Sequence, residues 1–269
     1  MAIVKSLFQI KGSVGEYTFY TMRGSKKLIM RTKGGPNKKQ MENSPNFENV
    51  RKNQTEFGGC TKFGSKCRKA FGELYRFADY NLNSVLTGIG KTLMKMDTTN
   101  EPGKRSLNLS THKEMLEGFN FNKGHSYTSV LRVFPAWELK RDALQAVVTY
   151  PVINTGIDLQ NFKRLPFFRL IIAVGTVSDM TYDTVNEKYK PMVEALHGAS
   201  DTLVGEWNST QTILPAQSMT VQMHESRIAL LTDNVTVLLS MGIEFGNVGV
   251  YGEPVEANNI GSGKVIACR

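Results

Sequence analysis

The sequence has few of the features that mark secreted, disulfide-rich or membrane-spanning proteins. It holds only three cysteines in 269 residues, Cys60, Cys67 and Cys268, and three cannot all pair, which is typical of a reducing compartment. The start of the chain has neither the apolar stretch nor the cleavage site of a signal peptide. No apolar run approaches the roughly 20 residues of a spanning helix. We therefore expect cytoplasmic synthesis without a signal peptide, and no transmembrane segment.

Catalytic and metal-binding motifs are also missing. The segment 88–92, Gly-Ile-Gly-Lys-Thr, resembles the end of a P-loop, but Val85 stands where the motif needs its first glycine and the surrounding pattern is helical. Residues 198–202 lack the closing glycine of a nucleophile elbow. None of the four histidines has a partner at metal-ligand spacing; they are His112, His125, His197 and His224. We expect a protein that is not an enzyme, with no cofactor and no metal ion.

Positive charge is present in excess and is unevenly distributed. The net charge is +9; residues 1–105 hold 20 Lys/Arg and 8 Asp/Glu, whereas residues 106–269 hold 13 and 16. Such asymmetry indicates that the N-terminal half faces a polyanion, a membrane surface or an acidic partner. A basic face that is simply solvated is the plainer alternative.

The N-terminal half shows two kinds of periodicity. Alternating apolar residues at 16–20 and 27–32, with glycines between them, predict β-hairpins within the first 35 residues. From Ser44, a good N-cap, apolar residues recur at gaps of three and four as far as Met96. One helix over 45–96 would be about 78 Å long at 1.5 Å per residue. We therefore expect a break at 81–84 or 88–90, giving two antiparallel helices, and the several helical glycines indicate close packing.

Strand-like segments dominate the rest of the chain. A polar linker over 98–110 and a short helical segment at 112–116 lead into it. The expected strands are 127–134, 144–150, 167–177, 202–207, 219–224, 227–231, 236–241 and 264–268. The predicted fold is α+β: an N-terminal β-hairpin and amphipathic helix pair, followed by an antiparallel β-sandwich. The predicted divisions are 1–105 for the basic region, 106–126 for the linker and 127–269 for the sandwich.

Basic and aromatic residues combine into one candidate functional surface. They would either grip phosphates and stack bases, or form the buried face of the hairpin. The second interpretation is favoured, because a two-stranded ribbon is unstable unless one face is covered, by the helix, the sandwich or a neighbouring copy. The candidate assembly or polyanion-binding surface comprises Tyr17, Phe19, Tyr20, Arg23, Lys26, Lys27, Arg31, Lys33, Lys38, Lys39, Lys62, Lys66, Arg68 and Lys69.

The first quarter of the chain resembles an uncharacterised bacterial protein family, a domain of unknown function. The resemblance lies in the segment 10–20, Ile-Lys-Gly-Ser-Val-Gly-Glu-Tyr-Thr-Phe-Tyr, and in the spaced residues of 43–58: Asn43, Pro45, Phe47, Arg51, Asn53, Glu56, Phe57 and Gly58. It implies a bacterial origin and a hairpin-plus-helix start. It carries no activity that could be transferred to these residues.

These features favour a non-enzymatic structural protein that assembles with copies of itself as a filament, shell or appendage subunit. The alternative is a nucleic-acid-binding protein that uses the basic half. A sandwich that binds carbohydrate through Trp137 or Trp207 is a third hypothesis, although tryptophan in a strand is more often a core residue.

Overall fold

The computed structural model describes residues 2–4, 10–22 and 27–269, and it divides the chain into two compact units, residues 1–51 and residues 52–269. Both helices and antiparallel sheets are present, so the predicted α+β class is confirmed. The boundary differs from the expected one at residue 105. The two long helices pack on the strand-rich part, and only the N-terminal sheet with the segment after it forms a separate unit.

The first unit contains a four-stranded antiparallel sheet in the order β1-β4-β3-β2. Its strands are β1 (Ala2–Val4), β2 (Gly12–Val14), β3 (Tyr17–Thr21) and β4 (Leu28–Thr32). The expected hairpins are therefore present, with β1 as a strand that the sequence did not reveal. A short helix α1 (Lys38–Asn43) follows, capped by Asn37 and Gln40 in a reciprocal capping box. The 3-10 turn η1 (Pro45–Phe47) then leads into the first long helix.

The predicted long helix is broken, as expected. The pieces are α2 (Glu48–Ala70), the 3-10 helix η2 (Gly72–Phe77) and α3 (Leu82–Met96). The second helix begins in the first of the two expected places, because the Asn81 side chain accepts a hydrogen bond from the Ser84 backbone N–H. Gly88 and Gly90 lie inside α3 instead of breaking it. None of the helices in the described residues has the length and apolar character of a membrane span.

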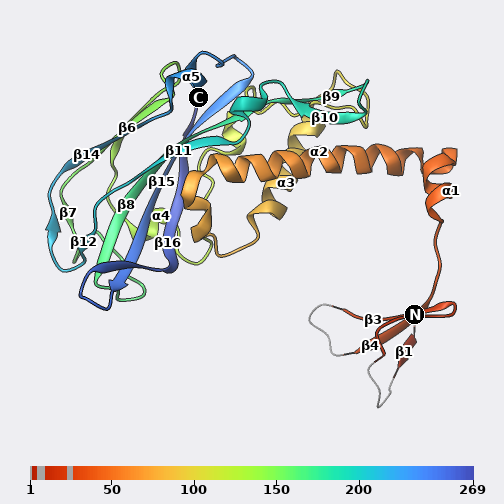
Figure 1. Ribbon diagram of the computed structural model, residues 1–269, viewed down its shortest axis with the longest axis horizontal. Coiled ribbons are helices and arrows are strands. Elements are labelled where there is room, and N and C mark those ends of the chain that lie inside the picture. Colours follow the sequence, from red (N-terminus) through yellow and green to blue (C-terminus); the bar gives the residue numbers. More distant parts are fainter. Residues whose placement is uncertain (1, 5–9, 23–26) are drawn as a thin grey trace. The chain divides into compact units, whose positions relative to one another are not determined.

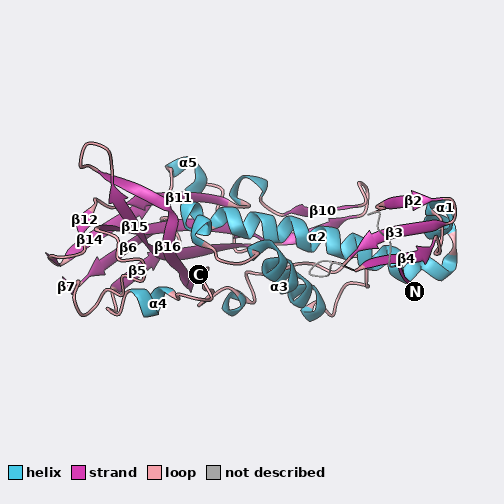
Figure 2. Cartoon of the chain, turned by 90° about the horizontal axis from the view of Figure 1, so that it is seen from below, coloured by secondary structure: helices cyan, strands magenta, loops and turns pink. Residues whose placement is uncertain are grey.

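Two antiparallel sheets form the body of the second unit (Figures 1 and 2). The central sheet runs β11 (Ala199–Val204), β8 (Phe167–Ser178), β15 (Val235–Val248), β16 (Pro254–Cys268), and β12 (Asn208–Ser209) extends it beside β8. The outer sheet runs β14 (Gln217–Gln222), β6 (Gln145–Tyr150), β5 (Ala136–Lys140). Two small pairs join β9 (Met180–Asp183) to β10 (Lys188–Pro191), and β7 (Ile153–Asn154) to β13 (Ile213–Leu214).

The central sheet is buried on both faces. Ile171 and Ala173 of β8 belong to the core that it shares with α2, η2 and α3, whereas Ile172 and Val174 belong to the core shared with the outer sheet. The alternation follows from the two-residue period of a strand. The predicted sandwich is thus present, and η2 with the C-terminal end of α2 packs on the other face of its central sheet (Figure 1).

Two expected strands are helical turns in the structure. Residues 127–134 contain α4 (Tyr127–Val130), and residues 227–231 overlap α5 (Glu225–Ile228). The Ser126 carbonyl accepts hydrogen bonds from the N–H groups of Ser129 and Val130, and the His224 side chain accepts one from Ser226. Local hydrogen bonds therefore decided these short segments over their apolar pattern, with a side-chain cap only at His224. The 112–116 segment holds a 3-10 turn, η3 (Lys113–Met115), as expected.

The helical glycines explain how closely α2 and α3 approach. A Cβ on Gly64 would lie 3.0 Å from the backbone nitrogen of Thr87, whereas a Cβ on Gly88 would meet nothing within 4 Å. We expect Gly64→Ala to lower the free energy of unfolding by about 1–3 kcal/mol through overpacking. Gly88→Ala should raise it by about 0.5–1 kcal/mol, because alanine favours the helix. Urea titrations of both variants give the comparison; equal effects would contradict this account of the helix contact.

Candidate functional site

The register of the N-terminal sheet sorts the candidate aromatic residues onto opposite faces. Phe19 pairs with Met30 and Tyr20 pairs with Ile29 across β3 and β4. Directly paired residues point to the same side, and neighbours along a strand point to opposite sides. Tyr17 and Phe19 therefore share a face with Val14, Leu28 and Met30, which we call the apolar face.

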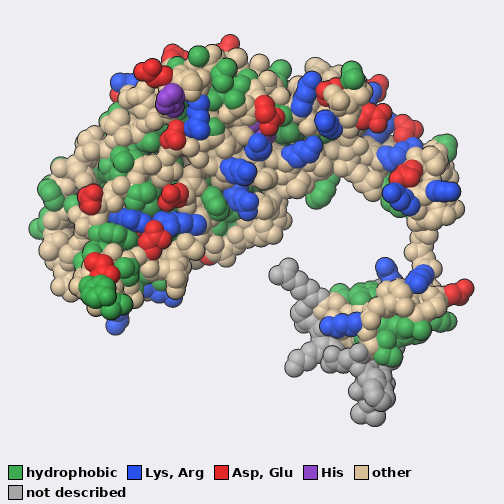
Figure 3. All heavy atoms as spheres, in the orientation of Figure 1, with side chains coloured by type: hydrophobic (Ala, Val, Ile, Leu, Met, Phe, Trp, Pro, Cys, Tyr) green, Lys and Arg blue, Asp and Glu red, His purple; other side chains and the backbone are tan. Residues whose placement is uncertain are grey.

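The apolar face is poorly covered. Tyr17 keeps 44% of its surface exposed, Val14 is also exposed, and Phe19, Leu28 and Met30 are only half-buried. Among the described residues of this unit, Ile29 is the single buried hydrophobic residue, and it lies on the other face. Apolar side chains are visible on the surface of this unit in Figure 3. The aromatic residues thus do not form a closed core within the described part of the unit.

The opposite face is polar and basic. The Arg31 guanidinium lies 5.6 Å from the centre of the Tyr20 ring, and the hydroxyls of Ser13 and Thr18 are 3.1 Å apart. Lys27, Lys33, Lys38 and Lys39 are exposed, and Lys38 makes a long, exposed ion pair of 3.7 Å with Glu42. Arg23 and Lys26 lie outside the described residues. Arg31 and Tyr20 are thus a basic and an aromatic residue that meet on this face.

The four candidate residues on α2 do not form one surface. Lys62 and Lys66 line a groove beside β10, whereas Lys69 lines a different hollow beside β11. The Arg68 guanidinium lies 5.4 Å from the centre of the Tyr75 ring. The sequence grouped these residues by nearness along the chain; the turn of the helix separates them.

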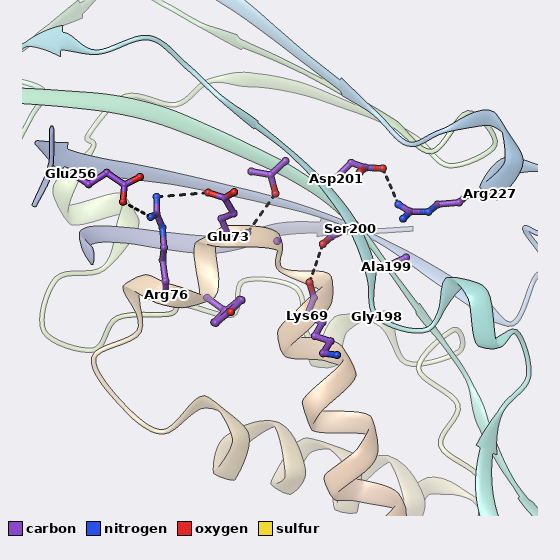
Figure 4. A pocket seen from close by; sticks show the side chains of 12 residues that line it. Lys69, Glu73, Arg76, Gly198, Ala199, Ser200, Asp201, Arg227 and Glu256 are labelled. Atoms are coloured by element: carbon purple, nitrogen blue, oxygen red, sulfur yellow. Dashed lines mark hydrogen bonds and ion pairs between the residues drawn. The ribbon is translucent and has the colours of Figure 1, made fainter. Parts of the chain in front are cut away.

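The hollow that Lys69 lines is shown in Figure 4 and has a volume of about 830 Å³. Its charged side chains pair with one another: Arg227 lies 2.9 Å from Asp201, and Arg76 lies 3.0 Å from Glu256. The Ser200 hydroxyl donates to the Lys69 carbonyl at the end of α2. Most of the charge in this hollow is thus already neutralised.

A buried ion-pair network lies at one side of the same hollow. Glu244 of β15 is 0% exposed and meets Arg76 of η2 at 2.7 Å and Arg169 of β8 at 2.7 Å. Burial raises the pKa of Glu244, although both arginines oppose the shift. Glu256 bridges the same two arginines from the surface. The network ties η2 to three strands of the central sheet.

The tryptophans proposed as ligand platforms have protein neighbours. The Arg169 guanidinium lies 4.3 Å from the centre of the Trp207 ring, and the same ring packs where a Cβ on Gly246 would stand. The Arg269 guanidinium lies 5.6 Å from the centre of the Trp137 ring. These contacts give the Trp207 ring a packing role, whereas the Trp137 ring keeps 38% of its surface exposed.

The cysteines and histidines give no sign of a metal site or a reactive thiol. All three thiols are free and buried, and burial raises the pKa of Cys60 to about 11. Within the described ranges, no group of three or more His, Cys, Asp or Glu is placed to hold a metal ion. His197 is buried beside the groove of Lys62 and Lys66, a position that no spacing in the sequence indicates.

Similarity to known proteins adds no assignment to this geometry. The resemblance of the first quarter to an uncharacterised bacterial family stays a prediction. No protein-family model matches the sequence, and no curated protein or solved structure matches the chain.

Proposed function

We propose that the protein is a structural subunit that assembles with copies of itself, the apolar face of the N-terminal sheet in one copy covering an apolar hairpin tip of the next. The observation that carries the proposal is the exposure of Tyr17 and Val14 beside half-buried Phe19, Leu28 and Met30. A sheet is stable when at least one apolar face is packed against another layer. A neighbouring molecule would provide that layer.

The second unit offers a matching surface at the tip of the β15–β16 hairpin. Val250 and Tyr251 are 91% and 93% exposed, and Val248 beside them is also exposed. An exposed apolar cluster of this kind marks an interaction site more often than a chance feature of the surface. The tip is therefore a reasonable seat for an apolar partner.

Charge favours the pairing of these two surfaces. Residues 1–51 hold ten Lys/Arg and three Asp/Glu. Residues 246–257, around the hairpin tip, hold two glutamates, Glu253 and Glu256, and no Lys or Arg. Opposite charges steer association and suppress pairing of like surfaces, so a basic sheet disfavours docking on a second basic sheet.

The proposed contact joins two different surfaces, the apolar face of one copy and the hairpin tip of the next, and is therefore head to tail. Such head-to-tail contacts generate a ring where the rotation between neighbours closes and an open filament where it does not. Both outcomes fit a filament, shell or appendage subunit, and neither requires a catalytic residue.

The test compares two neighbouring residues of β3 that point to opposite faces. Tyr17→Glu places a carboxylate on the apolar face and should weaken self-association about tenfold or more, as loss of a central aromatic contact does. Thr18→Glu adds the same charge on the Arg31 face and should leave association within about twofold. Sedimentation velocity at micromolar concentration and low salt measures both.

The same measurement tests the other proposed surface, the tip of the β15–β16 hairpin. Replacing Val250 and Tyr251 together with serine should weaken association as Tyr17→Glu does, because the hairpin tip would be the partner of the apolar face. A wild-type chain that is strictly monomeric under these conditions would refute the proposal. Association that both β3 variants weaken equally would refute the apolar face as its site.

Nucleic-acid binding is the second candidate function, and the stacking of Arg31 on Tyr20 is the observation that favours it. A guanidinium beside a partly exposed ring, as Tyr20 is, can contact a phosphate while the ring stacks on a base. Affinity for single-stranded DNA should then fall steeply between 50 and 200 mM salt, at about one counterion per neutralised phosphate. Arg31→Ala should weaken binding; an absence of DNA and RNA binding at ~50 mM salt ends this alternative.

A further inference from the structure

A groove of about 710 Å³ lies in the second unit between α2 and the β9–β10 hairpin. One stripe of α2 forms its first wall, with Thr61, Lys62, Ser65 and Lys66 at helical spacing. The β10 strand forms the second wall, and His197, just after the 3-10 turn η4 (Glu194–Leu196), lines the groove with them. Its volume is that of a site for a small organic molecule.

The groove carries a surplus of positive charge. Lys62, Lys66, Lys188 and Lys190 line it, against the single carboxylate of Glu194. Lys66 meets Glu194 at 3.6 Å and Lys190 meets Asp183 at 3.0 Å. Lys62 and Lys188 make no ion pair with any described residue. Lys and Arg side chains gather over α2 and the neighbouring hairpin in Figure 3. This contrasts with the hollow of Figure 4, where cations and carboxylates pair.

His197 supplies an independent sign of a missing partner. Only 4% of its surface is exposed, and neither ring nitrogen has a hydrogen-bond partner among the described residues. Burial, with the nearby charge of Lys66, lowers the pKa of His197 to about 4, although the Ser178 backbone opposes the shift. The ring is therefore neutral at pH 7, with one N–H to donate. A buried polar group left without a partner costs free energy, which a ligand atom would recover.

The remaining lining decides the kind of ligand. Met180, Tyr189 and Pro191 contribute apolar surface. The Tyr189 hydroxyl is engaged elsewhere, because it donates to the Arg105 carbonyl at 2.9 Å, so its ring is what the groove can offer. Several lysine ammonium groups suit a multiply charged phosphate, which they bind as point charges. An apolar wall beside them suits an organic body on that phosphate.

We propose that this groove binds a small organic phosphate, with Lys62, Lys66 and Lys188 around the phosphate, and that the His197 ring, whose nitrogens are enclosed in the wall of the groove, turns to donate a hydrogen bond to it. The proposal is independent of self-association, because none of these residues lies on the apolar face or at the β15–β16 tip. It also differs from polynucleotide binding by the N-terminal sheet, since the groove is sized for one small molecule.

The experiment titrates the full-length protein with pyrophosphate, ADP and a 20-nucleotide single-stranded DNA by isothermal titration calorimetry at pH 7. ADP and pyrophosphate should bind, ADP more tightly because its body meets the apolar wall. Replacing Lys62 and Lys188 together with alanine should weaken ADP binding at least tenfold. The matched control replaces Lys95 and Lys104, which lie outside the lining of the groove, with alanine and should stay within twofold.

His197 gives a readout that charge alone would not move. Adding ADP to the wild type should shift the ring ¹⁵N resonances of His197, and His197→Phe should weaken binding while leaving the circular dichroism spectrum unchanged. Absence of binding by pyrophosphate and ADP at millimolar concentration overturns the proposal. So does equal weakening in the Lys95/Lys104 control, or binding of the DNA alone, since either result would reflect general attraction to a basic surface.

Discussion

Replacing Glu244 with alanine should lower the free energy of unfolding by about 3–5 kcal/mol, the usual cost of removing one partner from a buried ion pair. Glu244 is fully buried within β15 and pairs with two arginines that come from other segments, Arg76 and Arg169. Without its carboxylate, two partly buried guanidinium groups keep only the half-exposed carboxylate of Glu256 as a common partner. The destabilisation therefore comes mainly from partly buried positive charge that Glu256 compensates only in part, and the missing attraction to the Glu244 carboxylate is the smaller part.

Glu256 is the matched control, because it pairs with the same two arginines. It lies 3.0 Å from Arg76 and 2.6 Å from Arg169, but its side chain is 50% exposed. Glu256→Ala should therefore cost only about 0–1 kcal/mol, as exposed ion pairs do. Urea unfolding at pH 7 measures both variants. Equal decreases in stability would contradict the view that burial of Glu244 sets the stability of the network.

The strands and helices that follow a regular period could be predicted from the sequence. Alternation at 17–20 marked β3, and gaps of three and four marked α2 and α3. The continuous apolar run 170–174 marked a buried strand, but nothing in it shows that one face meets helices and the other a sheet. Short segments such as 127–130 were misassigned, because a few local hydrogen bonds, here to the Ser126 carbonyl, can decide four residues.

The candidate site was harder to predict, because separation along the chain does not show which side chains share a surface. Tyr17 and Arg31 belong to the same hairpin, yet the register places them on opposite faces. Lys62 and Lys188 line one groove although more than a hundred residues separate them. No linear spacing indicates such a pair. The prediction from the sequence treated the basic residues of the N-terminal half as one surface, and the fold distributes them over separate surfaces, one of which is the groove.

The second large effect that we expect is a loss of stability at acidic pH, through Glu56. Glu56 of α2 is buried and accepts hydrogen bonds from the Gly103 backbone N–H at 2.8 Å and from the Arg105 guanidinium at 2.7 and 2.8 Å. Lys91 of α3 approaches its other side at 2.5 Å. One carboxylate thus joins both long helices to the loop that follows them. Burial alone would raise the pKa of Glu56, but these donors outweigh it and lower the pKa from 4.5 to about 2.

The free energy of unfolding should fall as the pH falls, because the folded and unfolded chains bind the Glu56 proton with different affinities. The folded chain holds this proton more weakly than the unfolded chain, so Glu56 contributes its stability above pH 4.5 and loses it as the pH falls toward about 2. A shift of this size corresponds to about 3 kcal/mol. Asp97, whose pKa is also lowered, acts in the same direction. His197 lowers the free energy of unfolding at a higher pH, between 6.5 and about 4. In that range the unfolded chain binds a proton at His197 that the folded chain, with its depressed pKa, does not bind.

Comparison with Glu56→Gln isolates the contribution of Glu56, because Asp97 and His197 titrate equally in both proteins. We expect Glu56→Gln to be less stable than the wild type at pH 7 by about 3 kcal/mol, and the difference to shrink as the pH falls from 4.5 toward 2.5. Glu101→Gln, an exposed carboxylate in the same loop, should follow the wild type throughout. Urea titrations between pH 7 and 2.5 measure all three. A difference that stayed constant over that range would mean that Glu56 stabilises the loop by shape and hydrogen bonding, without a contribution from its charge.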